Sequence, residues 1–176
     1  MSFTNRSCGA ALRPYLWLII LFLSVFGQKG FAKTHLLTIE IGPFPDGSVQ
    51  RHSLTTDSLS DMVVTEFATS TVWTEGVDRF SGVLLWDMLL HLGVEPMGWN
   101  GEITLQALDG YSATLGPAHV KENAPLLAVH QNGRLMPRRA RGPVWLVFPY
   151  DDNPAFRNET IYALSVWQIE HVSIKP

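Results

Sequence analysis

Cysteine is almost absent from this sequence, which has one residue of that type, Cys8, among 176. Cys8 lies in a predicted N-terminal leader, so the chain that remains after removal of the leader has no thiol. Disulfides, thiolate nucleophiles and sulfur-ligated metal sites are therefore excluded from that remaining chain.

Hydrophobic runs are also scarce, and the most continuous one, near the N-terminus, is short. Arg6 and Arg13 precede the apolar stretch 16–26, and the small-x-small site Gly30-Phe31-Ala32 follows it. This pattern predicts a secretory signal over residues 1–32 and a periplasmic or secreted protein. The apolar stretch is about half the roughly 20 residues that a membrane-spanning helix needs. We therefore expect membrane attachment only through an uncleaved signal.

Positive charge is sparse in the rest of the chain. Residues 33–176 form 144 residues, the size of a single domain, with 10 Lys and Arg against 16 Asp and Glu. The resulting formal charge of −6 argues against a nucleic-acid partner. No phosphate loop, no G-x-S-x-G and no G-x-G-x-x-G occurs, and the six histidines show no i,i+4 pair. These absences leave no motif for an ordinary hydrolase, a nucleotide-binding protein or a zinc enzyme.

The most regular apolar pattern is the stretch 80–94, FSGVLLWDMLLHLGV. Its spacing predicts an amphipathic helix, with Ser81 as N-cap and Gly93 as left-handed C-cap. The apolar stripe consists of Leu84, Leu85, Met88, Leu89 and Leu92.

Strand patterns outnumber helical ones elsewhere in the chain. Strands are predicted at 35–41, 49–54, 63–73, 102–108, 111–115, 125–131, 134–136, 144–148 and 168–174. Asp109-Gly110 and Asn132-Gly133 are two-residue hairpin signals, and short helical turns are expected at 56–62 and 117–122. The predicted class is α+β, with a mixed, mainly antiparallel sheet and short helices.

Two polar clusters are candidates for chemistry. Asp151 and Asp152 follow an apolar strand, so they could serve as paired carboxylates together with Arg141, or simply form a solvated turn. A dense basic cluster could bind an anion or lie in a solvated loop. It consists of Arg134, Arg138, Arg139 and Arg141.

Five segments in order resemble the molybdopterin-binding domain of the sulfite-oxidase family of oxidoreductases. They are FSGVLLWDMLLHLGV, LDGYSATLGPAHV, PLLAVHQNGRLMP, RGPVWLVFP and SVWQIEHVSI. The resemblance implies a sulfite-oxidase fold for residues 33–176 and a cofactor pocket between the segment before Phe80 and the loops around 109–111 and 138–143. The cofactor-binding residues that it implies are Thr71, Trp73, Arg79, Asp109, Tyr111, Arg139, Arg141 and Tyr150. In this arrangement Arg139 and Arg141 would hold an anion and Trp73 would provide a stacking wall.

The chain departs from the family at the positions that matter for the metal. The family's enzymes hold molybdenum through a cysteine on the segment before the 80–94 stretch, whereas residues 67–79 offer only hydroxyl groups. A neutral hydroxyl is a poor substitute for a thiolate on a transition metal. Trp145 and Val166 also stand where the family tends to have an arginine and a lysine that suit a pterin phosphate.

These departures predict an exported domain that lacks molybdenum redox catalysis and acts as a ligand-binding or partner-sensing module. Its partner would be an envelope protein or a small anionic ligand. In this interpretation the domain has no resident cofactor, and no residue is assigned to catalysis or to metal binding. The alternative is a molybdopterin-dependent oxidoreductase of the sulfite-oxidase type, whose metal is held by the pterin dithiolene and a hydroxyl or water. The sequence leaves open whether the protein is an enzyme.

Overall fold

A computed structural model describes residues 35–176 except 56–57, 59–61 and 63. The predicted signal and most of the predicted turn at 56–62 lie outside these described residues. Within them, no helix has both the length and the apolar character required to cross a bilayer.

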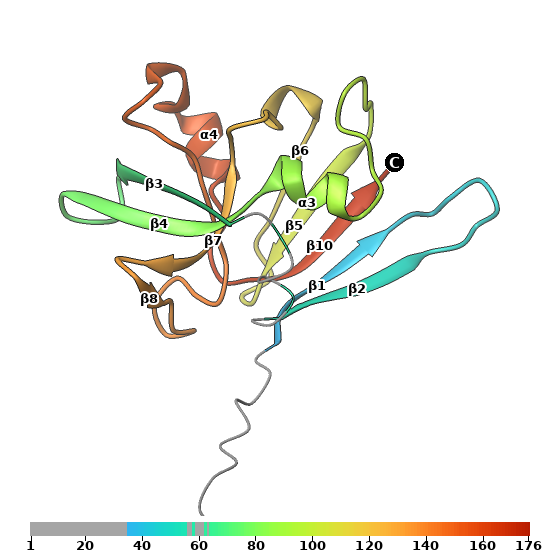
Figure 1. Ribbon diagram of the computed structural model, residues 1–176, viewed down its shortest axis with the longest axis horizontal. Helices are drawn as coiled ribbons and strands as arrows, with labels where there is room; N and C mark the ends of the chain where they lie inside the picture. The colour runs from blue at the N-terminus through green and yellow to red at the C-terminus, as the bar shows by residue number, and fades with distance from the viewer. Residues whose placement is uncertain (1–34, 56–57, 59–61, 63) are drawn as a thin grey trace, which may run out of the picture. The chain divides into compact units, whose positions relative to one another are not determined.

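The first of two sheets brings the two ends of the described chain together. Its order is β2-β1-β10-β5-β6, and β1 runs parallel to β10 while the other pairs are antiparallel. Figure 1 shows β10, the last strand, between β1 and β5. The strands are β1 (His35–Ile41), β2 (Gln50–Thr55), β5 (Glu102–Ala107), β6 (Ser112–Leu115) and β10 (Ile169–Lys175).

The second sheet is antiparallel throughout and contains the centre of the sequence. Its order is β3-β4-β7-β8, and β9 pairs with β7. The strands are β3 (Val64–Ser70), β4 (Val77–Leu84), β7 (Leu126–Gln131), β8 (Arg134–Leu135) and β9 (Trp145–Val147). With few short helices and mainly antiparallel sheets, the predicted α+β class is confirmed.

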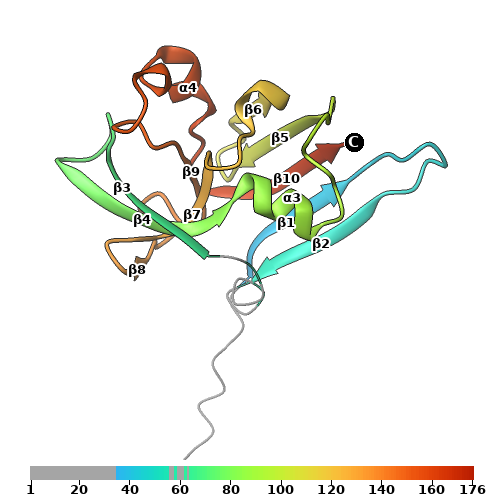
Figure 2. The same cartoon turned by 45° about the horizontal axis from the view of Figure 1, so that its top comes forward.

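The prediction of one helix over 80–94 is wrong in its first third. β4 continues to Leu84, and only then does helix α3 (Leu85–His91) begin, as Figure 2 shows. Ser81 pairs with β3 on one side and β7 on the other, so it cannot be the N-cap, and no side chain caps the helix. Gly82 allows this pairing, because a Cβ there would lie 2.0 Å from the carbonyl oxygen of Leu127. Gly93 does adopt the left-handed conformation expected after the helix, with φ of 76°.

The helix α4 (Glu159–Leu164) was not predicted. Asn158 is its N-cap, and the Asn158 side chain accepts a hydrogen bond from the Ile161 amide at 3.0 Å. Two 3-10 turns, η1 (Pro117–His119) and η2 (Pro154–Phe156), complete the helical elements. The predicted strand 63–73 ends three residues early, at Ser70, because residues 71–76 form a loop.

The core joins side chains from both sheets to α3. Leu85, Met88 and Leu89 of α3 are buried, as the stripe predicts, and Leu92 is half-buried. The largest fully buried side chains include Trp145 and Phe80, whose rings meet edge-to-face at 5.3 Å. Each such burial contributes about 1.5–3 kcal/mol as an upper value. This core places β9 and the segment after α4 directly behind the site described next.

Candidate ligand pocket

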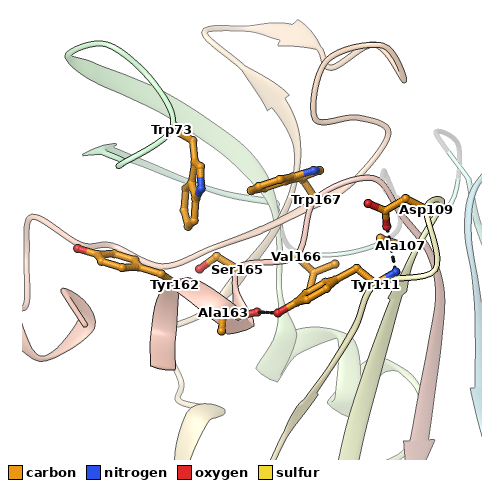
Figure 3. Close-up of a pocket in the computed structure, with 9 residues that line it drawn as sticks. All are labelled: Trp73, Ala107, Asp109, Tyr111, Tyr162, Ala163, Ser165, Val166 and Trp167. Atoms are coloured by element: carbon orange, nitrogen blue, oxygen red, sulfur yellow. Dashed lines mark hydrogen bonds between the residues drawn. The ribbon is translucent and has the colours of Figure 1, made fainter. Parts of the chain in front are cut away.

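A cavity of about 310 Å³ lies where three separate parts of the chain meet. The loop between β3 and β4 contributes Trp73, the β5–β6 hairpin contributes one side, and α4 with the segment before β10 contributes the other (Figure 3). The lining residues are Trp73, Ala107, Asp109, Tyr111, Tyr162, Ala163, Ser165, Val166 and Trp167. We call this cavity the aromatic pocket.

Aromatic rings form most of its walls. The Trp73 ring meets that of Tyr162 at a centroid distance of 5.8 Å and an interplanar angle of 83°. It meets the Trp167 ring at 5.5 Å and 74°. Edge-to-face contacts of this kind add about 0.5–1.5 kcal/mol each beyond area burial. Figure 3 shows Tyr111 as the fourth aromatic side chain around Ser165 and Val166.

Trp73 is held in place by the loop that carries it. The Trp73 amide donates to Thr71 Oγ1 at 3.1 Å, and that hydroxyl is also within 2.9 Å of Thr74 Oγ1. The Arg141 guanidinium donates to the Trp73 carbonyl oxygen, and its Cζ lies 5.2 Å from the centre of the Trp145 ring. Thr71 and Arg141 therefore support the wall of the pocket but do not line it.

Asp151 fastens the start of the same loop. Its carboxylate accepts from the Ser70 amide at 2.5 Å, from Ser70 Oγ at 2.6 Å and from Arg157 at 2.6 Å. The Ser70 hydrogen bonds, with a further contribution from Arg157, lower the pKa of Asp151. The Asp151 amide donates in turn to Thr69 Oγ1 at 3.1 Å. These contacts join the end of β3 to the loop that follows β9.

A buried hydrogen-bond chain lies beneath the pocket. Trp145 Nε1 donates to the Ser165 carbonyl oxygen at 3.1 Å, and Tyr150 Oη lies 2.6 Å from Ser165 Oγ. Ser165 Oγ donates to the Ile161 carbonyl oxygen at 2.7 Å, so the Tyr150 hydroxyl is the donor to Ser165. Burial raises the pKa of Tyr150 to about 12. The neutral phenol is thus fixed as a structural donor.

The β5–β6 turn forms the rim. Tyr111 Oη donates to the Ala163 carbonyl oxygen at 2.9 Å, which ties the hairpin to α4. The Tyr111 amide donates to Asp109 Oδ1 at 2.9 Å, and the Ala107 amide donates to the Tyr111 carbonyl oxygen at 2.9 Å. The hairpin is found where the Asp-Gly signal predicts it, but only Gly110 has a positive φ, of 87°, and the turn is one residue longer than the predicted two-residue loop. Asp109 is the one charged residue among those that line the pocket, and no basic side chain is among them.

The structure brings together only part of the site implied by the resemblance. Trp73, Asp109 and Tyr111 line the pocket, and Tyr150 lies behind it with its ring 6.4 Å from that of Trp73. Arg79 does not belong to this group, because it is an exposed residue of β4 whose guanidinium pairs with Glu66 at 2.7 Å.

The proposed anion-binding arginines are also separated from the cavity. Arg139 is exposed and does not line it, and Arg141 is committed to Trp73 and Trp145. Asp151 pairs with Arg157, not with Arg141, so the arrangement in which Asp151 and Arg141 act together is not assembled.

Sequence reasoning missed the half of the pocket that α4 supplies. Tyr162 and Ala163 lie in a helix of six residues that was not predicted, and Ser165 is its C-cap. The available signal was Asn158, an N-cap residue type followed by a glutamate and a short apolar run.

The chemistry of the lining does not fit a molybdenum-bearing pterin. Residues 67–79 present hydroxyl groups in place of a thiolate, and the Thr71 hydroxyl is already bonded within its loop. Trp145 and Val166, at the positions of the family's basic residues, are buried. A pterin phosphate in the pocket would face the Asp109 carboxylate without a compensating cation from the lining residues.

Comparison with known proteins finds a likeness among solved structures. No family model and no curated protein matches the chain. The sulfane dehydrogenase SoxCD from Paracoccus pantotrophus is similar in structure, with a TM-score of 0.56 and 17% identity. The match covers 80% of this chain but 38% of that one, so this chain spans well under half the length of its neighbour. At this identity the likeness shows the fold alone, and it is consistent with the sulfite-oxidase-like fold that the sequence resemblance implies.

Proposed function

We propose that this protein is an exported binding module with a sulfite-oxidase-like fold, in which the aromatic pocket holds a small organic ligand and no molybdenum redox chemistry takes place. The observation that carries the proposal is the lining of the pocket, with four aromatic side chains, one carboxylate and no basic residue. Such a lining suits an apolar or flat ligand that is positioned by few polar groups.

The size of the cavity supports a small ligand. About 310 Å³ lies at the lower end of the range found for small-molecule sites, roughly 300–1,000 Å³. The walls are held by the Asp151, Thr71 and Tyr111 contacts described above, so the pocket is organised before a ligand arrives. Preorganisation of this kind lowers the entropic cost of binding.

The sequence prediction of an anionic ligand is not supported by this arrangement, because neither Arg139 nor Arg141 lines the pocket. The proposal also includes an envelope-protein partner that recognises the ligand-bound form of this protein. Export rests on the predicted signal, and cleavage after Ala32 would give a mature protein that begins at Lys33.

Native mass spectrometry of the protein isolated from its own cell envelope tests the proposal. We expect a non-covalent mass increment of a small organic molecule that disappears on denaturation. The Trp167→Ala variant should lose the increment, because it removes a wall of the pocket. Trp86→Ala is the matched control, since Trp86 is also half-buried but lies on α3 outside the pocket.

Two results would contradict the proposal. One is a native protein that carries no small molecule and does not bind any member of a small-molecule panel. The other is an increment that has the mass of a molybdopterin, which would favour the oxidoreductase alternative.

A further inference from the structure

We infer that the aromatic pocket recognises an organic cation, a ligand with a quaternary or methylated ammonium group. This inference rests on the proposed binding function and specifies the class of ligand. It is drawn from the orientation of the rings and from the sign of the charge at the rim.

The rings that line the pocket lie in different planes. Trp73 stands nearly perpendicular to both Tyr162 and Trp167, with interplanar angles of 83° and 74°. Figure 3 shows Trp73 and Trp167 on one side of the pocket and Tyr162 and Tyr111 on the other. The face of an aromatic ring carries negative electrostatic potential, so several faces around one space attract a diffuse positive charge. Tryptophan is the most effective ring for this purpose, and the pocket contains two.

The one charged lining residue has the complementary sign. One Asp109 oxygen accepts from the Tyr111 amide, and the carboxylate remains at the rim of the cavity. Arg141 bonds to the Trp73 backbone and stacks on Trp145 without lining the pocket. A bound cation would therefore meet a carboxylate and aromatic faces, whereas an anion would meet the same carboxylate without a positive partner in the lining.

A methylated ammonium also suits the apolar character of the walls. Its charge is spread over methyl groups that need no hydrogen bonds, so it can enter a pocket with few acceptors at little desolvation cost. The free acceptors are few because Ser165 Oγ accepts from the Tyr150 hydroxyl and the Ala163 carbonyl accepts from Tyr111. A primary ammonium, with three donors to satisfy, should bind more weakly.

Three probes of nearly equal shape separate charge from shape. They are choline, its neutral isostere 3,3-dimethylbutan-1-ol and the anionic 3,3-dimethylbutanoate. Titration calorimetry of the full mature protein, supported by tryptophan fluorescence, measures the Kd of each. We expect choline to bind at least about fivefold more tightly than the alcohol, and the anion to bind most weakly.

Two substitutions test the assigned residues. Tyr162→Leu keeps an apolar wall but removes a π-face, so it should reduce choline binding severalfold while it leaves binding of the neutral alcohol within about twofold. Tyr162→Phe restores the ring and should restore the preference for choline. Asp109→Asn keeps the oxygen that accepts from the Tyr111 amide and should lower choline affinity only, whereas Glu122→Gln, an exposed acid outside the pocket, should change nothing.

Three results would overturn the inference of a cation site. Equal or tighter binding of the alcohol or the anion overturns the inference of a cation site but leaves the proposed binding function in place. Failure of all three probes overturns the inference as well, and the native mass increment then decides whether the binding function survives. A choline preference that Tyr162→Leu does not alter shows that the rings are not its source, and this also overturns the inference.

Discussion

Replacing Asp151 with asparagine should loosen the loop that carries Trp73. The wild-type carboxylate accepts two hydrogen bonds from Ser70, at 2.5 and 2.6 Å, and one from Arg157 at 2.6 Å. Hydrogen bonds to a charged acceptor contribute about 1.5–3 kcal/mol each when they are shielded from solvent. The Asp151 and Arg157 side chains are 29% and 50% exposed, so the ion pair itself contributes less than about 1 kcal/mol.

Asparagine keeps one acceptor oxygen but loses the charge and the second acceptor. Because the hydrogen bonds from Ser70 are exposed to solvent, we expect Asp151→Asn to lower the free energy of unfolding by about 1 kcal/mol at neutral pH. For a domain of this size that corresponds to a fall of about 3 °C in Tm. Urea unfolding of both proteins, followed by tryptophan fluorescence, gives the difference directly.

The effect should depend on pH in one direction. The pKa of Asp151 is lower in the folded protein than in the unfolded chain, where a carboxyl titrates near pH 3.9. Its stabilising contribution is therefore complete above that unfolded value and is lost as the pH falls through the folded pKa. The difference in free energy of unfolding between wild type and Asp151→Asn should therefore become smaller as the pH falls below about 4.

Asp152→Asn is the matched control, because Asp152 is an exposed neighbour that is absent from the contacts to Ser70 and Arg157. It should change stability by less than about 0.5 kcal/mol. The reasoning is refuted if Asp151→Asn lowers the free energy of unfolding by no more than Asp152→Asn does. It is also refuted if the difference in free energy of unfolding between wild type and Asp151→Asn is independent of pH.

Two further predictions concern the core behind the pocket. Gly82→Ala should destabilise the fold by about 1–3 kcal/mol or more, because the added Cβ would lie 2.0 Å from the Leu127 carbonyl oxygen. Gly116→Ala is the control, since a Cβ at that position meets no atom within 4 Å. Comparison of the Tm values of the two variants checks the prediction. Tyr150→Phe should cost about 1 kcal/mol through loss of the bond to Ser165 and should remove the tyrosine ionisation near pH 12 from an ultraviolet titration. The raised pKa means that the Tyr150 contribution is present below pH 10 and fades as the pH rises through about 12, so a Tyr150→Phe protein that retains this late ionisation would contradict the assignment.

Local signals in the sequence were sufficient for most strands and for the Asn132-Gly133 turn. Asn132 and Gly133 adopt φ values of 52° and 73°, which is the geometry that an Asn-Gly hairpin turn requires. The strand β1 was predicted at its observed bounds, because alternation and flanking turn residues define it without reference to the rest of the chain.

The boundary between β4 and α3 could not be read from the pattern alone. Phe80 and Val83 fit an apolar helix face equally well, but pairing with β3 and β7 on both sides satisfies the backbone of this segment as a strand. The alternation of buried residues along β4 becomes visible only once those partners are known. Tertiary pairing here overrides the helical periodicity.

The site was predictable only through its conspicuous residues. Trp73, Asp109 and Tyr111 were placed at the pocket by the family resemblance, and all three line it. Tyr162 and Trp167 come from a helix and a segment whose approach to Trp73 depends on the fold of the whole domain. The same resemblance grouped Arg79 and Arg139 with them, but Arg79 is an exposed residue of β4, Arg139 is exposed, and neither lines the pocket.

The most direct test of the account is the metal and pterin content of the protein purified from its own cells. Elemental analysis for molybdenum and tungsten, together with pterin fluorescence after oxidation, measures both on one sample. Because the pocket lining offers aromatic faces and a carboxylate in place of a thiolate and basic residues, we predict far less than one metal or pterin per chain. Stoichiometric molybdenum with a pterin would contradict the central claim and would establish the chain as a redox enzyme of unusual ligation.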